Sequence, residues 1–125
     1  REAYRTLMST AFDNLEIPIN KPLFEWVIEN ICKNAVDAMG GHGKIEVIIS
    51  DQTQFAYVDI RDTGKGIAKN MYKRVFEPGY TTKKRGWGLG LSLTQRIVCD
   101  LHNGDISVVE SSNSGTIIRI KIPKI

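Results

Sequence analysis

The chain has 125 residues, of which 42% are hydrophobic and 25% are charged, close to the averages of globular domains, so wholesale disorder is excluded. No apolar run approaches the roughly 18 residues that a membrane-spanning helix needs. A net charge of +3 is too small to require a nucleic-acid partner. We expect one domain over residues 1–125. Because the first residue is Arg1 and no signal-peptide pattern follows, we also expect a piece of a longer protein.

The two cysteines, Cys32 and Cys99, lie in apolar stretches with helical spacing, without a CxxC motif or a Cys/His cluster. This pattern favours buried, reduced thiols over a disulfide and argues against a structural zinc site. A cytoplasmic location follows as the expectation, with membrane attachment of a longer protein left open.

The first strong element is a helix predicted from Asn20 to about Met39, after a short helix-like lead-in over residues 1–13. Pro22 is tolerated in the first turn of a helix, and the glycine-rich residues 40–43 end it. Apolar residues recur at helical spacing and form a core stripe: Val27, Ile31, Ala35 and Ala38.

Residues 45–49 and 55–62 predict two strands joined by a turn. In the second strand, Ala56, Val58 and Ile60 share one face, because side chains alternate along a strand. Asp62 ends that row, so we expect its carboxylate to face the core.

A second long helix is predicted to open at Leu89 and to end at residues 102–104; it carries Leu93, Ile97 and Leu101. Residues 105–110 and 116–122 then predict a strand pair, in which Thr116 is a polar residue at the end of an apolar row. The order of helix, two strands, loop, helix and two strands predicts a two-layer α/β sandwich, with a mixed or antiparallel sheet and helices on one face.

Asn30, Asn34 and Asp37 share one stripe of the first helix, at the border of its apolar face. Carboxamides in such a place are able to supply neutral oxygen ligands to Mg²⁺, which takes its other contacts from phosphates and water. The alternative is the solvated edge of an amphipathic helix.

The run Asp62-Thr63-Gly64-Lys65-Gly66-Ile67 follows the second strand. A carboxylate in an apolar pocket suits the exocyclic amine of adenine, and glycines let the backbone approach a flat ring. The alternative is a tight turn that begins at Asp62.

The run Gly86-Trp87-Gly88-Leu89-Gly90-Leu91 leads into the second helix and suits a phosphate at a helix N-terminus, or else is a flexible linker. It matches neither the P-loop nor the Rossmann spacing. Upstream, residues 69–85 carry six basic residues against Glu77 alone. This basic segment is predicted to be a lid over polyphosphate. The alternatives are a surface loop or a weak nucleic-acid patch, and no stacking platform supports the latter.

Together these motifs resemble the catalytic ATP-binding domain of bacterial sensor histidine kinases, in the GHKL (Bergerat-fold) superfamily. The resemblance covers residues 18–123 and rests on four ordered boxes: residues 29–35, 62–67, 75–78 with 81–83, and 86–93. The resemblance implies an α+β sandwich, with a mixed, mostly antiparallel sheet of about five strands backed by three helices on one face. It also implies ATP and Mg²⁺ as ligands.

By resemblance, Asn34 would bind Mg²⁺ with Asn30 beside it near the phosphates, and Asp62 would bind the adenine amino group. Lys83 and Arg85 would be lid cations near the phosphates. The other positions implied to bind the nucleotide are Gly64, Gly66, Ile67, Phe76, Thr81, Thr82, Gly86, Gly88, Leu89, Gly90, Leu91 and Thr116.

One departure from the hydrolysing members of the superfamily concerns Asn30. Topoisomerase, chaperone and mismatch-repair ATPases carry at that position a Glu that activates water. Efficient hydrolysis is therefore not expected, and the nucleophile would be a histidine outside this chain. His42 and His102 lack a phosphoacceptor context. A second departure is Trp87, where Thr is common; it would either pack the lid or cover apolar surface.

The expected partners are the missing histidine-bearing dimerisation domain and, indirectly, a response regulator. No nucleic acid is expected. The chain alone would be monomeric and the full-length protein a homodimer. Two rival functions are a serine kinase of the same superfamily acting on a regulatory partner, as in anti-sigma factors, and a non-catalytic nucleotide-sensing module.

Overall fold

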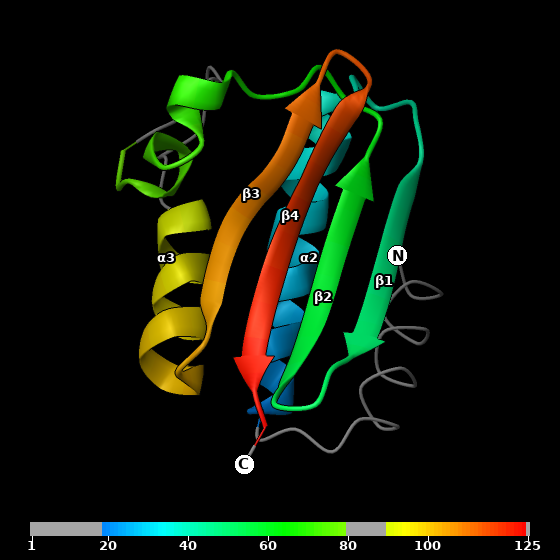
Figure 1. Ribbon diagram of the computed structural model, residues 1–125. Helices are drawn as coiled ribbons and strands as arrows, with labels where there is room; N and C mark the ends of the chain where they lie inside the picture. The colour runs from blue at the N-terminus through cyan, green and yellow to red at the C-terminus, as the bar shows by residue number, and fades with distance from the viewer. Residues whose placement is uncertain (1–18, 80–89, 125) are drawn as a thin grey trace.

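The computed structural model describes residues 19–79 and 90–124, and these form two layers, a sheet with helices on one face (Figure 1). This confirms the predicted sandwich. Within these ranges no helix has both the length and the hydropathy to cross a membrane. The elements in chain order are α2 (Lys21–Ala38), β1 (Ile45–Asp51), β2 (Phe55–Asp62), η1 (Lys69–Met71), η2 (Arg74–Phe76), α3 (Gly90–Arg96), η3 (Ile97–Leu101), β3 (Asp105–Ser112) and β4 (Gly115–Pro123).

Helix α2 begins and ends where its sequence predicts. The Asn20 side chain caps the helix by accepting a hydrogen bond from the Leu23 N–H at 3.1 Å, and Pro22 occupies the first turn. Gly40, with a φ of +63°, turns the chain away at the other end. One face of the helix is buried, through Phe24, Val27, Ile28, Ile31, Cys32 and Ala35.

The sheet has four strands in the order β1-β2-β4-β3, and every neighbouring pair is antiparallel. The described part of the chain thus has four strands where about five were expected in a mixed, mostly antiparallel sheet. The physical reason is that this part holds only four alternating segments, and the fifth strand was expected from the family resemblance alone. Between Val108 and Glu110 the register of β3 shifts, so the edge strand is irregular there.

The second helix differs from its expected pattern. It is α-helical over Gly90–Arg96 and continues as a π-helical turn over Ile97–Leu101. Leu93 is 40% exposed and Leu101 is 63% exposed. The buried positions are instead Ser92, Thr94 and Val98. A spacing of four residues drifts by about 40° per step around an α-helix, and the wider π turn changes the phase again, so a run of such spacings does not stay on the core side.

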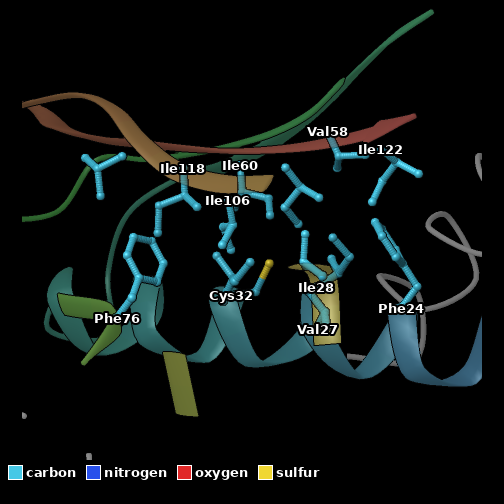
Figure 2. Packing of buried hydrophobic residues seen from close by; sticks show 14 of the residues in the cluster. Phe24, Val27, Ile28, Cys32, Val58, Ile60, Phe76, Ile106, Ile118 and Ile122 are labelled. Atoms are coloured by element: carbon cyan, nitrogen blue, oxygen red, sulfur yellow. The ribbon is translucent and has the colours of Figure 1, made fainter. Parts of the chain in front are cut away.

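The core lies between α2 and the inner face of the sheet (Figure 2). Figure 2 shows Phe24 at one end of this layer and Phe76 at the other, with Ile28 and Cys32 of α2 between them, facing Ile60 and Ile118. Each large apolar side chain buried in this way contributes about 1.5–3 kcal/mol. The helix thereby becomes a fixed support that runs along the inner side of the strands.

His102 ties the end of the second helix to the start of α2. The side chain is 5% exposed. Its Nε2 accepts a hydrogen bond from the Asn20 backbone N–H at 2.9 Å, and its Nδ1 lies 2.9 Å from the Ile97 carbonyl oxygen. Since a carbonyl only accepts, the ring is the neutral tautomer with its proton on Nδ1. The ring also packs against the Phe24 ring in a T-shaped arrangement, with the two ring centres 5.7 Å apart.

Candidate functional site

Asp62 ends β2 as a buried carboxylate, 8% exposed, as its place in the apolar row predicts. Its Oδ1 accepts the backbone N–H of Gly64 at 2.8 Å. Burial raises the pKa of the Asp62 carboxyl, and hydrogen bonds from the backbone of Gly64 and Thr116 act in the opposite direction without cancelling the effect. A carboxylate has about four lone-pair positions, so Asp62 retains capacity to accept from a ligand.

Thr116 stands directly opposite Asp62 in the pairing of β2 with β4 and is 5% exposed. The two polar residues that ended separate apolar rows in the sequence are therefore neighbours. The Thr116 hydroxyl lies 2.8 Å from the Ser111 hydroxyl, and Ser111 also accepts the Ile67 N–H at 2.6 Å. Ser111 was not predicted from the sequence, since nothing separates it there from the other serines of the turn.

The loop after Asp62 is held close to two other segments, and its glycines permit this. At Gly66, with a φ of +85°, an added Cβ would lie 2.1 Å from the Ser112 carbonyl oxygen. At Gly64 it would lie 3.0 Å from Ala38, and the Lys65 N–H donates to the Ala38 carbonyl at 3.2 Å. The loop is thus fixed between the β3–β4 hairpin and the C-terminal end of α2.

Asn34 and Asn30 extend from this contact along α2. With a rise of about 1.5 Å per residue, Asn34 lies roughly 6 Å along the axis from Ala38, and Asn30 roughly 12 Å. Both are half-buried, as expected for the border of the apolar stripe, whereas Asp37 is exposed. A nucleotide whose base lay near Asp62 would have room to extend its phosphates along α2, toward Asn34 and then Asn30.

The start of α3 meets α2 at Asn30. The Asn30 Nδ2 donates to the Thr94 hydroxyl at 3.1 Å, and a Cβ added to Gly90 would lie 2.9 Å from that nitrogen. The predicted phosphate end of the second helix and the predicted metal residues are therefore adjacent. Trp26 lies with Asn30 on the wall of a shallow surface hollow, together with Glu29 and Lys33.

The residues predicted for the lid and the helix start, Thr81, Thr82, Lys83, Arg85, Gly86, Gly88 and Leu89, lie outside the described residues, as does Trp87. On the near side of that segment, Phe76 is 4% exposed and packs into the core from η2. Ile67 and Leu91 are partly buried against the same core. These three predicted ligand-binding residues therefore also have a packing role.

The donor set limits what kind of cation the site fits. Within residues 19–79 and 90–124, no three His, Cys, Asp or Glu side chains gather as a metal cluster. The carboxamide oxygens of Asn30 and Asn34 are neutral and too few to enclose an ion. They fit Mg²⁺ that brings phosphates and water as its remaining ligands, which agrees with a metal that arrives with a nucleotide.

In a comparison with protein families, residues 20–125 match the model described as histidine kinase-, DNA gyrase B- and HSP90-like ATPase. The chain is 35% identical over 112 residues to sporulation kinase A of Bacillus subtilis, covering 90% of this chain and 18% of that protein. It is 40% identical over 116 residues to the signal transduction histidine-protein kinase AtoS of Escherichia coli, covering 89% and 19%. The chain thus spans about a fifth of these relatives.

Among solved structures, the catalytic domain of histidine kinase ThkA superimposes with a TM-score of 0.77 at 30% identity, over 86% of this chain and 71% of that one. ThkA has also been solved in complex with the response regulator protein TrrA; that structure matches with a TM-score of 0.74 at 28% identity, over 87% of this chain and 30% of that one. The four-stranded sheet with helices on one face is accordingly the fold of a histidine kinase catalytic domain.

Proposed function

The chain belongs to the family of histidine kinase-, DNA gyrase B- and HSP90-like ATPases, and from that premise we propose that it is the ATP-binding catalytic domain of a sensor histidine kinase. It would present the γ-phosphate of Mg·ATP to a histidine on a separate dimerisation domain. The observation that carries the proposal is the buried Asp62–Thr116 pair, joined through Gly64 to the helix that carries Asn34.

At the end of the site that holds the adenine base, the Asp62 carboxylate accepts a hydrogen bond from the adenine amino group. The Thr116 hydroxyl contacts the ring through a water molecule. The buried position of Asp62 supports this role, because a ring that lacks the matching donor would leave the remaining acceptor positions of a buried carboxylate unsatisfied. Gly66 and Ile67 lie beside the adenine ring, and their backbone is held in place by Ser111 and Ser112 of the β3–β4 hairpin.

At the phosphate end, Asn34 and Asn30 supply neutral oxygens for the metal, while Lys83 and Arg85 of the lid contribute positive charge. When bound, Mg²⁺ neutralises the charge that develops on the transferring phosphoryl group. Gly90 and Leu91 form the start of the helix after the lid. The work of this chain is positioning and charge neutralisation, the main requirements of phosphoryl transfer.

The residue at position 30 favours transfer to a protein over hydrolysis. A carboxamide cannot take a proton from water, and Glu29 is turned about 100° away around the helix. His102 is no substitute acceptor, because both ring nitrogens are engaged within the fold. The acceptor histidine is therefore assigned to the dimerisation domain, in a cytoplasmic homodimer that phosphorylates a response regulator.

Titration calorimetry with Mg·ATP tests the binding function. Asp62→Asn should lose most of the affinity, because its amide nitrogen either meets the adenine amine or breaks the Gly64 contact. Asp59→Asn is the matched control: Asp59 lies on the other face of β2, where it pairs with Arg119 at 2.8 Å. Equal affinity in wild type and Asp62→Asn would refute the assignment of Asp62.

Transfer is tested with γ-labelled ATP and a histidine-bearing dimerisation domain added to this chain. Label should appear on a histidine of the dimerisation domain, and no histidine should be labelled when that domain is left out. Label on His42 or His102 of the isolated chain would contradict the proposal. Label on a serine of a separate regulatory protein would favour the serine kinase, and absence of Mg·ATP binding by wild type would favour a non-catalytic module.

A further inference from the structure

Thr94 is a fully buried polar side chain that joins the two helices of the site. It lies in α3 with 0% exposure. Its hydroxyl donates to the Gly90 carbonyl oxygen at 2.8 Å, one turn earlier in the same helix. The same hydroxyl accepts from the Asn30 Nδ2 at 3.1 Å, across the contact with α2.

The single hydrogen of the Thr94 hydroxyl determines how the Asn30 carboxamide is oriented. A threonine hydroxyl has one hydrogen, and a carbonyl oxygen only accepts. The hydroxyl hydrogen of Thr94 is therefore donated to the Gly90 carbonyl oxygen. The Asn30 atom that faces Thr94 must therefore be a donor, the amide nitrogen. With one N–H committed to Thr94, the Oδ1 of Asn30 lies on the opposite side of the planar carboxamide.

A close packing contact holds the same carboxamide from a second direction. A Cβ added to Gly90 would lie 2.9 Å from Nδ2 and 3.1 Å from Oδ1 of Asn30. The carboxamide thus rests against the bare backbone of the residue at which α3 begins. Contact with Gly90 restrains the carboxamide from one side, and the hydrogen bond to Thr94 determines that its nitrogen, and not its oxygen, faces Thr94.

We propose that Thr94 is a positioning residue of the nucleotide site: it holds the Asn30 carboxamide so that its oxygen serves a bound Mg²⁺ or a water of the metal's shell. The alternative is that the nitrogen of Asn30 donates to a phosphate. This inference rests on the proposed function, since it assigns a role within the same site. Asn30 then adds a second neutral oxygen to that of Asn34.

Calorimetry with Thr94→Val and Thr94→Ser separates these roles. The valine keeps the shape and loses the hydroxyl, whereas the serine keeps the hydroxyl. We expect Thr94→Val to weaken Mg·ATP binding roughly five- to tenfold. Binding of ATP in EDTA and of adenosine should stay within about twofold of wild type. Thr94→Ser should restore binding. Gly90→Ala, which displaces the same carboxamide, should resemble Thr94→Val.

Three results would overturn the inference. A similar loss for all three ligands would show a general structural role. A similar loss for ATP with and without Mg²⁺ would show that the nitrogen of Asn30 acts on a phosphate. No loss would show that the contact has no role in binding. Failure of wild type to bind ATP or adenosine would instead refute the proposed function.

A measurement on the ligand-free protein tests the contact independently of binding. The side-chain amide resonances of Asn30, assigned by their absence in Asn30→Asp, should show slowed hydrogen exchange for one proton in wild type and in Thr94→Ser. The slow exchange should be lost in Thr94→Val. Equal exchange in wild type and Thr94→Val would refute the hydrogen bond on which the inference depends.

Discussion

Asp62 and Thr116 face each other across the β2–β4 pair, at one end of the buried face of the sheet. Each is the last member of an otherwise apolar row, so the hydrophobic layer ends in a carboxylate and a hydroxyl side by side. Gly115, with a φ of +137°, precedes Thr116, and a Cβ there would lie 1.9 Å from the Asp62 carbonyl oxygen. The register of β2 with β4 brings the two polar residues together, and Gly115 permits the close approach of the chain beside them.

The first prediction concerns the stability of Asp62→Asn as a function of pH. Burial raises the pKa of the Asp62 carboxyl in the folded state, so the native protein binds the carboxyl proton more tightly than the unfolded chain does. The stabilising contribution of the neutral carboxyl is complete below the unfolded pKa of about 3.9 and is lost as pH rises through the raised folded value. Asp62→Asn has no charge to bury at this position. As pH rises through this range, its free energy of unfolding should therefore increase relative to that of wild type.

Urea denaturation at a series of pH values, without nucleotide, measures this difference. The same variant should lose ATP affinity, so the site would be shown to reduce stability in exchange for binding. A variant that becomes progressively less stable than wild type as pH rises would contradict the sign of the pKa shift.

The second prediction concerns Ser111, which accepts the Ile67 N–H and contacts the Thr116 hydroxyl. Ser111→Ala should weaken adenosine and ATP binding alike, by roughly five- to tenfold, because both the loop and Thr116 lose a hydrogen-bond partner. Ser114→Ala, an exposed change in the same turn, is the control and should have little effect. Calorimetry with both ligands decides, and equal affinities for Ser111→Ala and wild type would show that Ser111 does not hold the base site.

The third prediction concerns His102. His102→Phe retains the contact with Phe24 but leaves the Asn20 N–H without its acceptor. The free energy of unfolding should fall by about 0.5–1.5 kcal/mol, the usual net contribution of a hydrogen bond that is only partly buried. His42 is exposed, so His42→Phe should change stability by less than about 0.5 kcal/mol. Urea denaturation of both variants makes the comparison, and equal stabilities would rule out the hydrogen-bonded role.

The fourth prediction concerns the reactivity of Cys99, which is partly buried. Burial raises the pKa of the Cys99 thiol, and the carboxylates of Asp105 and Asp100 raise it further. Because only the thiolate reacts, alkylation by iodoacetamide near pH 7.5 should be slower in the folded protein than in urea, and should accelerate as pH rises. Mass spectrometry of the Cys99 peptide follows the rate; a rate equal to that of the unfolded chain would contradict the shift.

Local patterns in the sequence determined the helix from Asn20 to Met39, the boundaries of β2, and the end of the second helix at His102. Each depends on neighbours in the chain: an N-cap with a proline, alternation with period two, and glycines at turns. The inward placement of Asp62 also followed from alternation alone, because a strand has only two faces.

Tertiary structure alone decided the strand order β1-β2-β4-β3, the exposure of Leu93 and Leu101, and the contacts of Thr94 and Ser111. Helical spacing gives the separation of side chains around an axis, but the face that meets the core depends on which element packs beside it. A hydroxyl likewise has no preferred partner in the sequence. Thr94 and Ser111 acquire their roles because folding brings Asn30 and Ile67, distant in the chain, within hydrogen-bond distance.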